Sequence, residues 1–88
     1  MNSIPTAGAP RPRLADGFAA LRENRLDAAV ALRDQWLAAF PGDAEVRFYA
    51  AEVGAFTGEL EAALAHIDAA IALAPGQWPL VLKRARLL

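Results

Sequence analysis

The fold is decided by the stretch LDAAVALRDQWLAAFPG at residues 26–42 and by its second occurrence, LEAALAHIDAAIALAPG, at residues 60–76. Each stretch opens with Leu, an acidic residue and Ala-Ala, and each closes in Pro-Gly, so that Pro41 and Pro75 lie 34 positions apart. A repeat of this period is typical of stacked helical arrays, in which each unit buries its apolar face only against its neighbours. The sequence therefore predicts an all-α array of antiparallel helical hairpins.

The composition agrees with one small helical domain. The chain has 88 residues, of which 56% are hydrophobic and 22% charged, and its many Ala residues favour helix. The formal net charge of −1 gives no electrostatic reason to bind nucleic acid or an anionic membrane, so neither is expected as a partner. Cys is absent from the sequence, which excludes disulfides and suits a reducing compartment.

We expect neither a membrane span nor a secretory signal. The longest uncharged stretch, residues 69–82, is interrupted by Pro75, Gly76 and Pro79 and cannot form one spanning helix. Residues 1–11 have neither the basic nor the apolar region of a signal peptide, and their Pro and Gly content predicts a flexible N-terminal segment. The expected location is therefore the cytoplasm.

Turn residues divide the rest of the chain into about five predicted helices. The first follows Pro12 and stops near Asn24, a residue that tolerates the left-handed conformation of a tight helix exit. The others are predicted at about residues 26–40, 44–57, 59–74 and 79–88. Asp43 is predicted to cap the start of the third helix, and Gly58 its end. Because the connections are short, consecutive helices are expected to be antiparallel neighbours.

Apolar residues recur at helical spacing along the third and fourth predicted helices. Such a stripe marks the face that a helix buries. The stripe of the third helix is Val46, Tyr49, Ala50, Val53 and Thr57, and that of the fourth is Leu60, Ala63, Leu64, Ile67, Ala70, Ile71 and Ala74.

The repeat resembles the tetratricopeptide repeat (TPR) family, whose unit is 34 residues folded as a helix–turn–helix. In the unit of residues 44–77, the family's small residues, turn Gly and terminal Pro are matched by Ala51, Gly58, Ala63, Ala70 and Pro75. The preceding unit, about residues 10–43, is more divergent, and residues 78–88 match only the start of a third. The resemblance implies a short right-handed superhelix of about two and a half repeats within a TPR-like domain at residues 12–88.

Two departures from the family pattern concern packing. Arg47, Ala50 and Gly54 stand where the family often has Trp, Leu and Tyr, so the first helix of the 44–77 unit is expected to be underfilled. Trp36 stands where the family has a small residue, which implies a shifted packing with Leu32 and Phe40 beside it.

The resemblance also implies a partner-binding surface, because the first helices of the family's repeats line a concave groove. Carried over by position, the candidate contacts to a peptide or partner helix are Phe18, Arg22, Arg25, Phe48, Glu52, Phe56, Leu82 and Arg86. Aromatic anchors flanked by charges suit such a groove. The alternative is that the three Phe side chains are ordinary core residues between hairpins.

The sequence offers no credible catalytic or metal-binding constellation. His66 is the sole His and is expected on a helix surface, so a His- or Cys-rich zinc site is not expected within one chain. Glu59 and Glu61 flank a helix start, where carboxylates stabilise the helix dipole. Ser3, the only Ser, lies in the N-terminal segment. We therefore expect a protein that is not an enzyme and needs no metal or cofactor.

Residues 78–88 form a second candidate surface, because their apolar side chains cannot all face the preceding hairpin. The candidate self-association edge is Trp78, Val81, Leu82, Leu87 and Leu88. Three explanations stay open: the chain is the N-terminal piece of a longer protein, it forms a homo-oligomer through its last helix, or it docks that helix on a partner.

The leading functional hypothesis is a scaffold or adaptor module that binds a protein or peptide in its helical groove. One alternative is a self-associating structural repeat protein. The other is the N-terminal TPR extension of a larger bacterial enzyme, such as a sulfotransferase or glycosyltransferase, with the chemistry located downstream.

Overall fold

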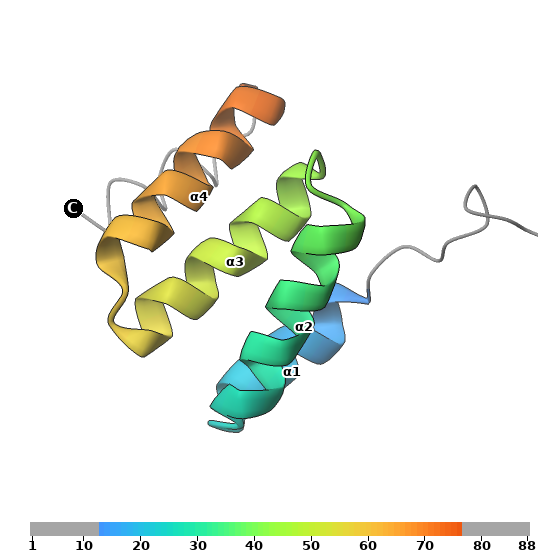
Figure 1. Ribbon diagram of the computed structural model, residues 1–88, viewed down its shortest axis with the longest axis vertical. Helices are drawn as coiled ribbons and strands as arrows, with labels where there is room; N and C mark the ends of the chain where they lie inside the picture. Colours follow the sequence, from blue (N-terminus) through green and yellow to red (C-terminus); the bar gives the residue numbers. More distant parts are fainter. Residues whose placement is uncertain (1–12, 77–88) are drawn as a thin grey trace, which may run out of the picture.

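The computed structural model describes residues 13–76, which form four α-helices joined by short turns (Figure 1). The helices are α1 (Leu14–Arg22), α2 (Leu26–Ala39), α3 (Ala44–Thr57) and α4 (Leu60–Leu73). No strand occurs within residues 13–76, so the prediction of an all-α chain is confirmed for this part. The predicted fifth helix at residues 79–88 and the predicted flexible segment at residues 1–11 lie outside the described residues.

The turns between helices are made as the sequence predicts. Asn24 has a φ of 59° and Gly58 a φ of 81°, so both adopt the left-handed conformation that ends a helix sharply. Asp43 is the N-cap of α3, with its Oδ1 atom accepting hydrogen bonds from the backbone N–H groups of Glu45 (2.9 Å) and Val46 (3.3 Å). Asn24 and Gly58 thus make the turns of the hairpins α1–α2 and α3–α4, and Asp43 starts the second hairpin.

Helix α3 occupies the middle of the fold. It packs against α4 on one side and against α1 and α2 on the other, and α1 also packs against α2 (Figure 1). The predicted stripe of α3 is buried at Val46, Tyr49, Ala50 and Val53. Thr57, the fifth predicted member, is exposed, and its hydroxyl donates a hydrogen bond to the Val53 carbonyl (3.0 Å) in the last turn of its own helix.

Tyr49 is at the centre of the core formed by α1, α2 and α3. Its ring meets Phe18 and Trp36 edge-on, with centroid distances of 5.3 and 5.1 Å, and its hydroxyl donates to the Ala29 carbonyl (2.9 Å). A Cβ atom added at Gly17 would come within 2.6 Å of the Tyr49 ring. Gly17 therefore provides the space that brings α1 onto this ring.

Trp36 packs in the same cluster and is only 7% exposed. Leu32 and Phe40, the neighbours expected for it, are half-buried members of that cluster. The hairpin α1–α2 thus accommodates a large side chain at the position where the resemblance implies a small one.

The contact between α3 and α4 is built on small residues. A Cβ atom at Gly54 would lie 3.0 Å from the Ala63 Cβ atom and 3.1 Å from the Glu59 carbonyl oxygen. The expectation that Gly54 leaves α3 underfilled is therefore wrong: without a side chain at this position, the two helices approach closely and fill the space with backbone.

Fewer residues of α4 are fully buried than the predicted apolar stripe contains. Ala63, Ile67 and Ala70 are buried, and Leu64 and Ile71 are half-buried. Leu60, predicted on the buried face, is 50% exposed, because it is the first residue of α4 and lies next to the turn.

Candidate functional site

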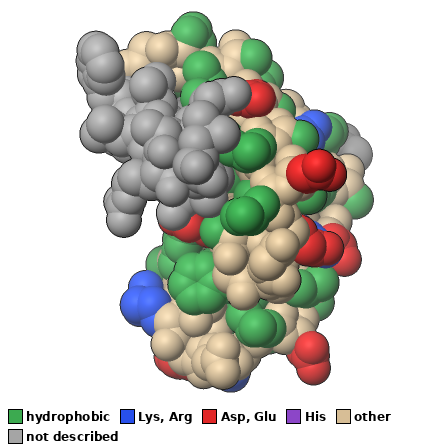
Figure 2. Space-filling model, turned by 90° about the vertical axis from the view of Figure 1, so that its left-hand side faces the viewer, with side chains coloured by type: hydrophobic (Ala, Val, Ile, Leu, Met, Phe, Trp, Pro, Cys, Tyr) green, Lys and Arg blue, Asp and Glu red, His purple; other side chains and the backbone are tan. Residues whose placement is uncertain are grey.

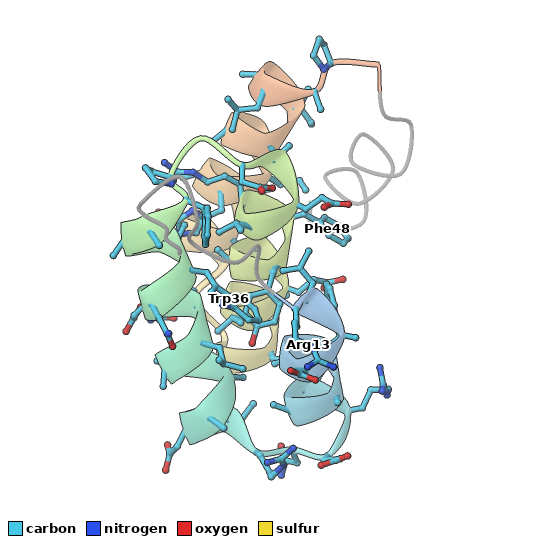
Figure 3. The ribbon with its side chains drawn as sticks, turned by 90° about the vertical axis from the view of Figure 1, so that its right-hand side faces the viewer. Arg13, Trp36 and Phe48 are labelled. Carbon is cyan, nitrogen blue, oxygen red and sulfur yellow. The ribbon has the colours of Figure 1, made fainter. Side chains whose placement is uncertain are left out.

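The face shared by α1 and α3 carries the predicted aromatic residues. Phe18 on α1 and Phe48 on α3 have ring centroids 6.1 Å apart, with their planes tilted by 47°, and both side chains are half-buried. Figure 3 shows Phe48 at the edge of α3, while Trp36 lies between the helices. Two helices that are not consecutive in the chain therefore contribute one aromatic pair that remains in part accessible.

Further predicted residues continue this surface along α3 and α1. Glu52 and Phe56 follow Phe48 at helical spacings of four and eight, which places all three on one side of α3. Phe56 is 54% exposed and Glu52 is half-buried. Arg22 is exposed in the last turn of α1, one turn beyond Phe18. We call Phe18, Arg22, Phe48, Glu52 and Phe56 the α1/α3 face.

Arg25 does not belong to this face, contrary to the prediction. Helix α1 ends at Arg22, so Arg25 is not one of its residues but the N-cap of α2. Its guanidinium Nη2 atom lies 2.9 Å from the Glu23 Oε1 atom, and both side chains are exposed. The two remaining candidates, Leu82 and Arg86, lie outside the described residues, as does the whole candidate self-association edge.

The alternative of three core phenylalanines holds only in part. Phe18 packs against the cluster around Tyr49, and Phe48 packs against the smaller cluster of Ala51, Ile67 and Ala70. Phe56 is not a core residue, since more than half of it is exposed. The α1/α3 face is thus an extension of the core to the surface.

A polar cluster at the junction of α2, α3 and α4 was not predicted. The Arg47 Nη1 atom lies 3.4 Å from the His66 Nδ1 atom, and the Arg47 Nε atom donates to the Pro41 carbonyl (2.9 Å). Arg33 is only 20% exposed, and its Nη1 atom lies 3.6 Å from the Glu59 Oε1 atom. His66 is accordingly half-buried instead of lying on the helix surface.

Burial and the charges of this cluster shift the pKa values of His66 and Tyr49. Burial lowers the pKa of His66 from its ordinary value of 6.5, and the positive charges of Arg47 and Arg33 lower the pKa further. His66 is therefore neutral at neutral pH, and its Nδ1 atom is an acceptor for Arg47. Burial raises the pKa of Tyr49, an effect that Arg33 opposes.

One sequence signal does point to this cluster. Arg33 and Arg47 directly follow Leu32 and Val46, two residues that are predicted to be packed. An Arg at such a position buries its aliphatic stem and brings its guanidinium group to the edge of the core. Two such residues in a chain with a single His indicate a polar cluster at the edge of the core.

The remaining described residues, in 13–76, do not bring polar side chains from different helices together into a further binding or catalytic site. Surface depressions of about 470 and 480 Å³ are each lined by five consecutive residues, 24–28 and 58–62, at the two hairpin turns. Within residues 13–76, no group of three His, Cys, Asp or Glu side chains is arranged to hold a metal ion. None of the four described helices is long and apolar enough to cross a membrane.

Comparison of the chain with protein-family models, with curated proteins and with solved structures found no match.

Proposed function

We propose that this chain is a TPR-like, non-catalytic interaction module that binds a peptide or helix of a partner protein on the α1/α3 face. The observation that carries the proposal is the aromatic pair of Phe18 and Phe48, half-buried at 6.1 Å and continued along α3 by the exposed Phe56. Partly exposed aromatic side chains on a rigid helical surface are the usual anchors of protein interfaces.

The order of helix contacts supports the TPR-like description. Helix α3 packs against both helices of the preceding hairpin, and α4 returns along α3. One hairpin therefore stacks on the next through its first helix, as the units of a helical repeat array do. The 34-residue spacing of Pro41 and Pro75 gives the same unit length in the sequence.

The charges beside the aromatic pair indicate what a partner should carry. Arg22 lies one helical turn beyond Phe18, and Glu52 lies one turn beyond Phe48. A bound segment with an apolar anchor between an acidic and a basic residue would match both edges of the face. Such rim charges contribute more to selectivity and association rate than to affinity.

The proposal is tested by selecting peptides from a display library on the purified full chain and measuring their dissociation constants by fluorescence anisotropy. Phe56→Ala is the first variant, because Phe56 is exposed and its removal leaves the core intact. We expect at least a ten-fold weaker affinity, which corresponds to about 1.4 kcal/mol. Arg22→Glu is expected to alter the charge preference of the selected peptides.

Leu73→Ala is the matched control, since Leu73 is an apolar residue of α4 with a similar exposure, 47%, and is not part of the α1/α3 face. Its affinity should stay within two-fold of the parent chain. Equal losses in Phe56→Ala and Leu73→Ala, no loss in either, or a library that yields no binder would contradict the proposal.

A further inference from the structure

The hairpin α3–α4 has one flank that α1 and α2 do not cover. On α4, the residues Leu60, Leu64 and Ile71 lie to one side of the buried stripe, while His66 lies to the other side, facing Arg47. Leu60 is 50% exposed, and Leu64 and Ile71 are half-buried. Together with Phe48 of α3, which packs on the same small cluster, these residues form an apolar strip that we call the α3/α4 flank.

The borders of the α3/α4 flank are acidic on both helices. On α3, Glu45 and Glu52 lie three residues before and four residues after Phe48, and therefore on its side of the helix. On α4, Asp68 lies four residues after Leu64, and Glu61 adjoins Leu60. Seen from the α4 side, hydrophobic side chains are interspersed with acidic ones (Figure 2).

Charge is distributed very unevenly along the chain. All ten acidic residues lie between residues 13 and 76, together with only five of the nine basic ones. Residues 77–88 contain Lys83, Arg84 and Arg86 and no acidic residue, and they are otherwise mostly apolar. An acidic, partly apolar flank is thus followed directly in the sequence by a basic, apolar segment.

We propose that residues 78–88 dock on the α3/α4 flank of their own chain. The apolar side chains of this segment cover Leu64 and Ile71, and its basic side chains lie beside Asp68 and Glu52. The segment follows closely on Pro75-Gly76, which adjoin the end of α4. This proposal concerns a contact within one molecule. Because Phe48 and Glu52 also belong to the α1/α3 face, the docked segment would border the surface proposed for the partner.

The length of the segment fits the flank. Its eleven residues would span about 16 Å as a helix, against about 21 Å for the 14 residues of α4. A segment of that length, running back along α4 from the turn at residues 75–76, reaches Ile71, Asp68 and Leu64. Opposite charges within a few ångströms attract each other more strongly at a partly desolvated surface than in bulk water.

The test is paramagnetic relaxation enhancement in the full-length chain. Because the sequence has no Cys, Ala85→Cys gives a single site for a nitroxide label. We expect the label to broaden the amide resonances of Leu64, Asp68 and Ile71 at least two-fold more than those at the start of α2. Broadening that is absent, or equal in all four helices, would overturn the proposal.

Two further samples distinguish the occupant and the force. Replacing Lys83, Arg84 and Arg86 by Glu in the labelled chain should reduce the broadening at α4 at least two-fold. The control, Arg25→Glu in the α1–α2 turn, should leave this broadening unchanged. Equal effects of the two changes would overturn the role of charge. A mixture of nitroxide-labelled chain and ¹⁵N-labelled chain without nitroxide should show no broadening. Broadening in that mixture would mean that a second copy occupies the flank, which overturns docking within one chain.

Discussion

At the scale of single residues, Tyr49 connects three helices. It belongs to α3, meets Phe18 of α1 and Trp36 of α2 edge-on, and hydrogen-bonds the Ala29 carbonyl of α2. Burying a hydroxyl group is unfavourable unless it finds a partner, and the 2.9 Å bond to Ala29 supplies one. The same burial raises the pKa of Tyr49, because a phenolate would lose its hydration there.

Gly17→Ala is expected to destabilise the protein. The new Cβ atom would lie 2.6 Å from the buried Tyr49 ring, so the ring or α1 has to move. Overpacking of this kind costs about 1–3 kcal/mol, more than the roughly 0.5–1 kcal/mol that Ala gains over Gly in a helix. The free energy of unfolding, measured by urea denaturation followed by circular dichroism, should fall accordingly.

The control for Gly17→Ala is the reverse substitution, from Ala to Gly, two positions earlier in α1. Ala15 is exposed on the same helix, so Ala15→Gly should lose only the helix preference, about 0.5–1 kcal/mol. If Gly17→Ala proved stabilising, the close contact between α1 and Tyr49 would not exist in solution.

His66 makes stability depend on pH. Its pKa is lowered in the folded chain, by burial and by Arg47 and Arg33, so the unfolded chain binds the proton more readily. The contribution of neutral His66 is therefore present above about pH 6.5 and is lost as the pH falls through that value towards the lowered pKa. Melting temperatures measured between pH 7.5 and pH 5 should fall more steeply in the parent chain than in His66→Gln.

The comparison with His66→Gln removes the contribution of the carboxylates, which titrate in both proteins. Gln stays neutral and keeps an oxygen atom that can accept a hydrogen bond from Arg47. Parallel melting curves for the two chains over this pH range would mean that His66 has the same pKa in the folded and unfolded states.

At the scale of helices, α3 starts differently from the other three. Its N-cap, Asp43, accepts two backbone hydrogen bonds, whereas the N-caps of α1, α2 and α4 make no side-chain cap hydrogen bond. Those helices begin after Arg13, Arg25 and Glu59. The strongest local start signal thus belongs to the helix that every other element packs against.

Asp43→Ala is expected to lower the free energy of unfolding by about 0.5–2 kcal/mol, because two amide groups at the start of α3 lose their acceptor. Asp43→Asn should restore most of this loss, since the Asn side-chain oxygen is an equally good cap. Chemical denaturation of the three proteins checks both expectations. Equal stability of the Ala and Asn variants would show that the cap contributes little.

At the scale of the whole molecule, α3 divides the interior into two clusters. The larger one joins α1, α2 and α3 around Tyr49, and the smaller one joins α3 and α4 around Ile67. Among the described helices, α4 packs mainly on α3. Of these four helices, α4 thus has one main neighbour and α3 has three, so α4 is expected to open locally more easily than α3.

Ile67→Ala should therefore act locally. Loss of this fully buried side chain costs about 2–5 kcal/mol, and native-state hydrogen exchange should show the loss of protection concentrated in α4. Val53→Ala, in the larger cluster, should instead lower protection in α1, α2 and α3 together. A uniform loss of protection in both variants would mean that the two clusters unfold as one unit.

The boundaries of the four described helices, and most of the residues that α3 and α4 bury, could be predicted from the sequence because their signals are local. Asn24 and Gly58 end helices wherever a left-handed residue is needed, Asp43 caps the amides directly after it, and Pro41 stops α2 within two residues. Each of these effects acts within one turn of chain. The same holds for the periodic stripe that includes Ile67.

The parts of the candidate surface that could not be predicted depend on residues far apart in the chain. Arg25 was expected on the groove because the resemblance was carried over by position, whereas in the structure it is the N-cap of α2 and its guanidinium group pairs with Glu23. His66 was placed on a surface because its own helix leaves it outside the apolar stripe, whereas Arg47 and Arg33 approach it from two other helices.

By itself, the sequence determined that residues 13–76 are all-α, where their turns lie and most of the residues that α3 and α4 bury, because hydrophobic period, caps and left-handed turn residues act over a few positions. Only the tertiary structure decided that Phe18 and Phe48 form one pair, that Gly17 accommodates Tyr49, that Gly54 lets α3 and α4 touch, and that Arg47 contacts His66. These contacts depend on how closely two helices approach and at what angle. That geometry results from side chains of several helices packing together and is not encoded in any one stretch of the chain.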